Sequence, residues 1–371
     1  MCNCQTGACL TGKLKLTPLL LFCWLPILYF SRVTSIQEYI GRRFNSKVRF
    51  CETICLLVYM VWYVGVNLFT MGKVLHHLLG WEIFWGAVLV ALLSVSYVSS
   101  GGQASVIMTD LFQGVMLLIT GALILGLGFA YLGGFDVFWD NLPGDSRKVF
   151  HNFNSDPGFP SGGIFWQDGL ANSIMFGFLH QGTIMRYMSA RAFMDCKKAV
   201  VTHLVVLMPL AACVVGGAGW LAKALANHGD LPGDMAADDS FYAATQLISQ
   251  PGIFGLILAA MIAALMSTVD TLITAISAVW VNDVHKQHIK KDMTDRQALM
   301  VARLTAIGAT LVGIAMVPVF MNFDSIYDAH GAFTAAVTPP LVVTFVLSVF
   351  WKRFTAPAAL ATLVIGLLAV G

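Results

Sequence analysis

Charged residues are scarce in this chain. Only 11% of its 371 residues are Asp, Glu, Lys or Arg, and 57% are hydrophobic, against roughly 25% and 45–50% in soluble domains. So few polar side chains cannot cover the surface of a soluble protein with this much apolar material. The composition therefore excludes an ordinary soluble domain and predicts one domain embedded in a lipid bilayer.

Several chemical patterns are also missing. No basic run with interleaved aromatic residues is present, so we expect no nucleic-acid partner. The histidines show no ligand spacing, and Cys2, Cys4 and Cys9 have no matching His or Cys group for a zinc site. Without such a set or a cluster of paired carboxylates, the sequence does not indicate an enzyme. No charged ring or carbonyl filter sequence favours a channel.

Apolar segments of about 20 residues recur along the whole chain, which is the length that a membrane-spanning helix needs. We therefore predict an all-α, polytopic membrane protein. It consists of an atypical N-terminal head over residues 1–13 and a single transmembrane domain of about ten helices over residues 14–371. The expected spans lie near residues 15–31, 51–79, 81–99, 104–131, 165–186, 199–225, 251–281, 299–321, 326–350 and 354–371.

Lys and Arg gather in alternate loops. Loops 32–50, 187–198 and 284–298 carry most of them, whereas loops 132–164 and 226–250 are rich in Asp, Gly and Pro. Because basic loops stay in the cytoplasm, the first three are expected inside and the other two outside. The pattern predicts a multi-pass protein of the plasma (inner) membrane.

The most informative segment lies in the seventh span. Ala264, Ser267 and Thr268 follow the spacing i, i+3 and i+4, so one helical face offers a backbone carbonyl and two hydroxyls. Neutral oxygens suit a cation that must bind weakly and leave again. The alternative is that both hydroxyls bond back to their own helix, as Ser and Thr often do in membranes.

Two acids fall inside expected spans. Asp270 follows the hydroxyl pair, and an intramembrane carboxylate normally faces a cavity or a partner, although this one could also reach toward the cytoplasmic interface. Asp110 and Gln113 are i, i+3 neighbours that can share a cation or a water. Alternatively, Asp110 is an acid placed near a helix start by the helix dipole. Asp110, Gln113 and Asp270 are our candidates for a second cation or release site.

The fifth span ends in polar residues beside a helix-breaking glycine. His180 and Gln181 precede Gly182 at membrane depth, which favours a position lining a cavity. Arg186, one turn later, is interpreted as a cytoplasmic anchor.

Five motifs in order resemble the sodium:solute symporter family, which includes the sodium–glucose, sodium–proline, pantothenate and iodide cotransporters. Each motif is weak alone, but together they cover nearly the whole chain. They are Ser35 to Phe44, Gly101-Gly102 to Gln113, Gln181 with Arg186-Tyr187, Met266 to Val284, and Thr338-Pro339-Pro340 to Arg353.

The resemblance implies an inverted-repeat (leucine-transporter-type) helix bundle that works by alternating access. It implies sodium-coupled symport of a small organic solute (a sugar, an amino acid or an organic acid), with Na+ as coupling ion and no organic cofactor. Ala264 through its carbonyl, and Ser267 and Thr268 through their hydroxyls, would form half of a sodium site. Asp110 matches an acid linked to ion release or to a further sodium site.

The resemblance also indicates where solute would bind. Phe176 falls where the family places an aromatic gate, and Ser173, His180, Gln181 and Gly331 are further candidates for the cavity. Gly331 stands where sugar-transporting members have a sugar-binding glutamine, which argues against a close glucose-type site.

The first expected span resembles the second core helix of the family, and residues 1–13 do not resemble the first. We therefore expect an incomplete bundle. Two alternatives to a working symporter follow: a transporter-like sensor domain, or a non-transporting fragment of a longer protein.

Overall fold

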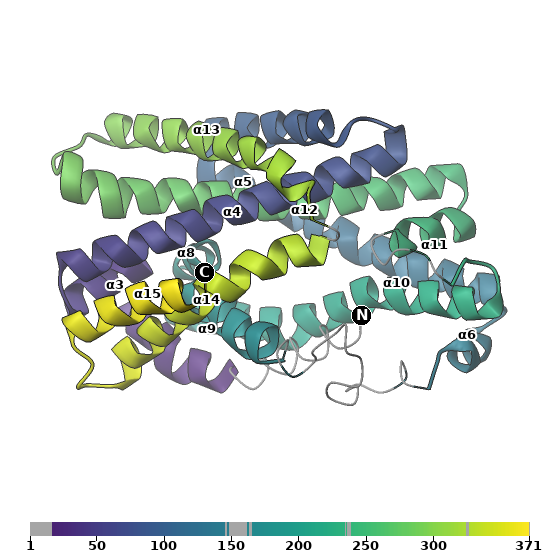
Figure 1. The fold of residues 1–371 in the computed structure, drawn as a ribbon, viewed down its shortest axis with the longest axis horizontal. Helices are drawn as coiled ribbons and strands as arrows, with labels where there is room; N and C mark the ends of the chain where they lie inside the picture. Colours follow the sequence, from purple (N-terminus) through teal and green to yellow (C-terminus); the bar gives the residue numbers. More distant parts are fainter. Residues whose placement is uncertain are drawn as a thin grey trace. The chain divides into compact units, whose positions relative to one another are not determined.

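The computed structural model describes residues 17–144, 147, 162, 165–233, 235, 239–323 and 326–370. All regular structure in these ranges is helical (Figure 1). The head over residues 1–13 and much of loop 132–164 lie outside them. Contacts divide the chain into two compact units. Unit 1 comprises residues 1–17, 110–173 and 199–264, and unit 2 comprises residues 18–109, 174–198 and 265–371.

Unit 2 is organised around the long helix α4 (Ser46–Leu79). α13 (Asp295–Phe320) packs along α4, as do α14 (Ile326–Phe350), α3 (Ile36–Arg43) and α15 (Ala356–Val370) (Figure 1). The other elements of unit 2 are η1 (Leu20–Trp24), α2 (Leu25–Ser31), η3 (Met175–Leu179), α8 (Gln181–Met188), most of α9 (Phe193–Val201) and η5 (Trp280–Ile289).

Local sequence fixes several helix ends in unit 2. Ser35 caps α3 by accepting a hydrogen bond from Glu38 N at 3.0 Å, and Asn45 caps α4 through Val48 N at 3.0 Å. α4 ends at Gly80, whose φ of 67° is left-handed and favours glycine. The expected loop 32–50 is therefore mostly helical, and its basic residues lie largely at the end of α3 and in the first turn of α4.

Helix α5 (Ile83–Leu132) is broken near its middle. Gly102 has φ 60° and ψ −152°, outside the helical region. An unbroken helix of 50 residues would be about 75 Å long, more than twice the apolar thickness of a bilayer. The break falls between the expected spans 81–99 and 104–131.

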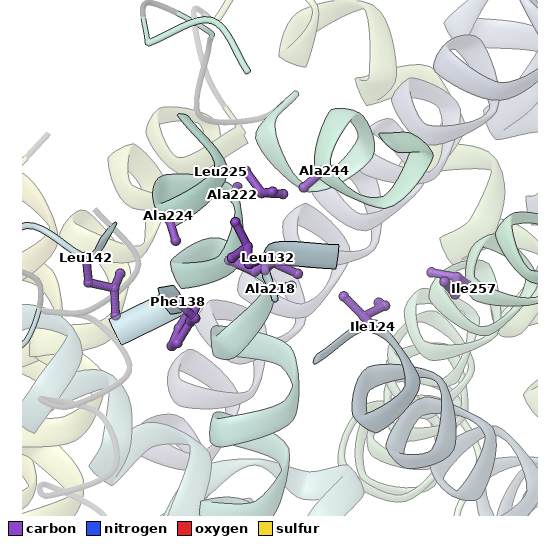
Figure 2. Packing of buried hydrophobic residues seen from close by; sticks show 11 residues of the cluster. Ile124, Leu132, Phe138, Leu142, Ala218, Ala222, Ala224, Leu225, Ala244 and Ile257 are labelled. Carbon is purple, nitrogen blue, oxygen red and sulfur yellow. The ribbon is translucent and has the colours of Figure 1, made fainter. Parts of the chain in front are cut away.

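Unit 1 contains the second half of α5, α10 (Met208–His228) and the start of α12 (Pro251–Val279). Its smaller elements are α6 (Phe135–Asn141), η2 (Phe165–Asn172), η4 (Thr202–Leu207) and α11 (Ser240–Ile248). Figure 2 shows its apolar core, in which Leu132, Phe138 and Leu225 come from α5, α6 and α10. Small residues on α10, such as Ala218 and Ala222, allow the other helices to approach.

Six helices in the described residues are long and apolar enough to span a membrane. They are Ser46–His77, Ile83–Leu132, Phe193–His228, Pro251–Ile289, Asp295–Phe320 and Ala329–Phe350. A seventh span results if Thr17–Ser31 and Ile36–Arg43, bent by 83°, count as one. Each of the ten expected ranges overlaps a helical segment, and their total of about ten spans stays a prediction. Apolar side chains such as Leu304 and Leu311 of α13 are exposed, as a lipid-facing surface requires.

A glycine controls the approach of α4 to the start of α5. A Cβ atom added to Gly72 would overlap the backbone carbonyl oxygen of Ile83, which cannot turn aside as a side chain can. Gly72→Ala should therefore destabilise the protein by about 1–3 kcal/mol, the usual effect of overpacking, although alanine favours helix. Gly126→Ala on α5 is the matched control, because its Cβ meets open space. The measurement is unfolding in mixed detergent micelles, and equal stability of both variants would contradict the close approach.

Candidate functional site

The candidate sodium ligands lie on one continuous helix, α12. Ala264, Ser267 and Thr268 are half-buried, and their spacing puts them on one helical face. The chain passes from unit 1 to unit 2 between Ala264 and Leu265. Later hydroxyls of α12 do bond back to their own helix: Thr274 donates to Asp270 O at 2.6 Å and Ser277 to Ile273 O at 2.8 Å.

Thr271 connects this segment to an arginine. Its hydroxyl donates to Ser267 O at 2.8 Å and accepts a short hydrogen bond from Arg186 Nη2. The Arg186 guanidinium is therefore only one hydroxyl away from the backbone of a candidate ligand. Interpreting Arg186 as a cytoplasmic anchor missed this contact, since a sequence does not show in which direction a long side chain points.

The helical backbone is interrupted at His180, between η3 and α8, where ψ is 100°. A Cβ on Gly182 would overlap Thr271 Cγ2, so glycine permits α8 to lie close to α12. His180 caps α8, its Nδ1 accepting from Thr183 N at 3.2 Å. Gln181 is 1% exposed and joins α8 to the start of α3, with Nε2 donating to Thr34 O at 3.0 Å. Both side chains thus hold the backbone at the break, and their proposed place in a cavity stays a prediction.

Asp270 is fully buried, with 0% exposure, so its side chain is enclosed by other residues of the protein. The buried hydroxyl of Ser94 on α5 faces it. The two groups act on each other, but among the described residues neither carboxylate oxygen of Asp270, nor Ser94 Oγ, makes a hydrogen bond that is well formed in both distance and angle. Asp270 is thus a buried carboxyl group, two residues after Thr268, that can still accept hydrogen bonds.

Asp110 and Gln113 lie one turn apart on α5, as expected, and both are half-buried in unit 1. The side-chain oxygen Gln113 Oε1 is buried and accepts no hydrogen bond within the described part of the chain. An acid and an unsatisfied amide oxygen on one face are suited to a cation or a water.

The remaining candidates are spread over several elements. Ser173 lies after η2 in unit 1 and is buried. Phe176 belongs to η3, and its side chain lies outside what the structure describes. Gly331 lies in α14 with open space where a Cβ would be.

Sequence reasoning overlooked a buried polar cluster in unit 2. Asp283 of η5 accepts from Ser35 Oγ at 2.8 Å and from Arg49 Nη2 at 2.6 Å. Ser35 and Asp283 belong to two of the family-like motifs, and they are 248 residues apart in sequence. Glu52, one turn after Arg49, is 1% exposed. An acid inside an apolar span, one turn from an arginine, was the signal that could have indicated this cluster.

The donor set on α12 fits an alkali cation. One carbonyl and two hydroxyls are hard, neutral oxygens, the kind of ligand that can replace part of the hydration shell of an ion without holding it too tightly. The arrangement favours a monovalent ion that is carried over one that is permanently bound.

The chain is similar to known sodium-coupled transporters over most of its length. A sequence model of the sodium:solute symporter family matches residues 5–366. A sodium/glucose cotransporter of Vibrio parahaemolyticus is 26% identical over 365 residues, covering 91% of this chain and 66% of that protein. A sodium-dependent multivitamin transporter of Oryctolagus cuniculus is 25% identical, covering 93% of this chain and 55% of that protein. A sodium/sialic acid symporter of Aliivibrio fischeri is 26% identical, with 94% and 70% covered. These relatives are transporters, not enzymes.

The solved structure of a Na+-coupled sialic acid symporter, bound to substrate and open outward, is similar in fold. Its TM-score is 0.82 at 20% identity, and the match covers 99% of this chain and 81% of that one. This confirms the expected all-helical transporter fold. The chain spans 66% and 55% of the length of the first two relatives above.

Proposed function

Because the chain belongs to the sodium:solute symporter family, we propose that it carries out sodium-coupled symport of a small organic solute by alternating access. The observation that carries this proposal is the match of the family model to residues 5–366. The neutral oxygens of Ala264, Ser267 and Thr268 on one face of α12 supply the chemistry that a coupling sodium ion needs.

We assign roles to these residues from their chemistry. The Ala264 carbonyl and the Ser267 and Thr268 hydroxyls bind the coupling ion. Thr271 occupies the Ser267 carbonyl, which fixes this turn of the helix in place. Asp110, with Gln113, is the candidate for a second cation or for ion release, and Asp270 is a further acid for that role.

The solute is a sugar, an amino acid or an organic acid. Relatives named for glucose, vitamins and sialic acid support this range. Ser173, Phe176, His180, Gln181 and Gly331 are the residues that we propose for its cavity and gate.

The chain is a multi-pass integral membrane protein. We place it in the plasma (inner) membrane with its basic loops in the cytoplasm. Loop 284–298 contains Lys290, Lys291 and Arg296, and the positive-inside rule supports their cytoplasmic position.

The proposal is tested by uptake into proteoliposomes that contain the purified chain. A panel of labelled sugars, amino acids, sialic acid and monocarboxylates is offered under an inward sodium gradient and under an equal potassium gradient. At least one solute should accumulate above equilibrium with sodium only, and a sodium ionophore should abolish its accumulation. Uptake that is indifferent to sodium would contradict symport. Sodium binding without uptake of any solute would instead favour the non-transporting alternative.

A further inference from the structure

The buried cluster in unit 2 has more acid than base. Asp283 is 0% exposed. All of its hydrogen bonds from described residues are accepted by Oδ1, from Ser35 Oγ at 2.8 Å, Arg49 Nε at 3.1 Å and Arg49 Nη2 at 2.6 Å. Arg49 is itself largely buried, with 13% of its side chain exposed. The guanidinium is thus committed to one oxygen of one carboxylate.

Glu52 lies beside this ion pair without a donor of its own. It is 1% exposed, and Asp283 is the charged group that faces it. Neither of its carboxylate oxygens has a hydrogen-bond partner among the described residues, and the same is true of Asp283 Oδ2. Three buried carboxylate oxygens therefore lie in one cluster with no donor.

The charges of Glu52, Asp283 and Arg49 do not balance if both acids are ionised. Two ionised carboxylates and one guanidinium would leave an uncompensated negative charge inside an apolar span. Burying an unpaired carboxylate is so unfavourable that such groups become neutral instead, and two neighbouring carboxylates cannot both ionise easily. Asp283 already has Arg49, so the neutral group is Glu52.

We propose that the Glu52 carboxyl is a proton-binding site, occupied while Arg49 is paired with the ionised Asp283. The proton turns one Glu52 oxygen into a hydroxyl donor, in a cluster whose unsatisfied oxygens otherwise have none. The site is distinct from the sodium ligands proposed on α12 and does not depend on them.

Among the described residues, Asp283 is the charged group that acts on Glu52. The other titratable groups of η5 are His285 and Lys286, which are half-buried, and His288, which is exposed beside Phe50. Cys55 is the neighbour on α4 itself, and Glu38 of α3 acts on Asp283 but is paired with Arg42. α15 has no titratable residue, and His330 of α14 lies beside Tyr63, about three turns along α4 from Glu52. The charged residues of α13 are exposed: Asp295, Arg296 and Arg303.

The proton has a structural consequence. Arg49 and Glu52 are i, i+3 neighbours on α4, so an ionised Glu52 would be within reach of the guanidinium. Loss of the proton would make Glu52 compete with Asp283 for Arg49. Protonation of Glu52 thus keeps Arg49 paired with Asp283. The pair connects α4 to η5, and the hydrogen bond from Ser35 to Asp283 connects η5 to the start of α3.

Infrared spectroscopy of the purified chain in lipid nanodiscs at neutral pH tests this proposal. A protonated carboxylic acid gives a carbonyl band that shifts in D2O. Subtracting the spectrum of Glu52→Gln from that of the wild type should reveal one such band. Glu38→Gln is the matched control, because Glu38 is ionised in its pair with Arg42, and its difference spectrum should show none.

A second variant tests the proposal without changing Glu52. Asp283→Asn frees Arg49 to pair with Glu52, which should then ionise, so the same carbonyl band should disappear. Persistence of the band in either Glu52→Gln or Asp283→Asn would overturn the proposal. Glutamine has the shape of the protonated acid, so a Glu52→Gln protein that does not fold would also overturn it.

Discussion

Arg49→Ala should destabilise the protein by about 3–5 kcal/mol. The change removes the only guanidinium that donates to Asp283 among the described residues, and removing one partner of a buried ion pair leaves an uncompensated buried charge. Asp283 would keep only the Ser35 hydroxyl as a donor. Unfolding in mixed detergent micelles measures the loss.

Arg42→Ala is the control for this effect. Arg42 pairs with Glu38 at 2.5 Å, but 54% of the Arg42 side chain is exposed, and exposed ion pairs contribute about 0–1 kcal/mol. Adding Asp283→Asn to Arg49→Ala should recover part of the loss, because the unpaired charge is then gone. Equal effects of Arg49→Ala and Arg42→Ala would show that the buried pair does not stabilise the fold.

Removing either hydroxyl of the proposed sodium site should weaken the apparent sodium affinity about tenfold. One polar contact contributes about 1.4 kcal/mol, and that free energy corresponds to a factor of ten. The double variant Ser267→Ala/Thr268→Ala should therefore lose roughly a hundredfold if the two contributions add. Solute uptake measured against sodium concentration gives the half-saturation values.

Two variants on the same helix serve as controls. Thr274→Ala and Ser277→Ala remove hydroxyls that bond back to Asp270 O and Ile273 O, so sodium affinity should stay unchanged. Membrane expression must be matched across all variants. If half-saturation stays constant in both single variants at Ser267 and Thr268, these hydroxyls are packing elements and the sodium site lies elsewhere.

The sequence predicted the features of this fold that depend on local patterns. Hydropathy located the long apolar helices, because a span must be apolar over its whole length. It missed the short helices α3, α6 and α11, which lie in segments expected to be loops. The expected spans 81–99 and 104–131 fall on either side of the break at Gly102, and the serine–glutamate spacing of Ser35 and Glu38 is a helix-start signal. Each of these signals lies within a few residues of the feature that it specifies.

Local sequence patterns could not predict contacts between residues that are far apart in the chain. The bond between Ser35 and Asp283 joins residues 248 positions apart, and neither residue is unusual in its own segment. Arg186 could equally have pointed to the cytoplasm, and only the packing of α8 against α12 at Gly182 directs it to Thr271. Candidate site residues on helices can thus be proposed from sequence, whereas the partners that orient them require the fold.

If the chain holds sodium on α12, equilibrium binding of radioactive sodium to the purified protein should depend on Ser267 and Thr268. The wild type should bind sodium saturably, unlabelled sodium should displace it, and an equal concentration of potassium should not. The Ser267→Ala/Thr268→Ala isotherm should shift to roughly a hundredfold higher sodium, while Thr274→Ala should follow the wild type. Saturable binding that is identical in the wild type and the double variant would contradict the claim.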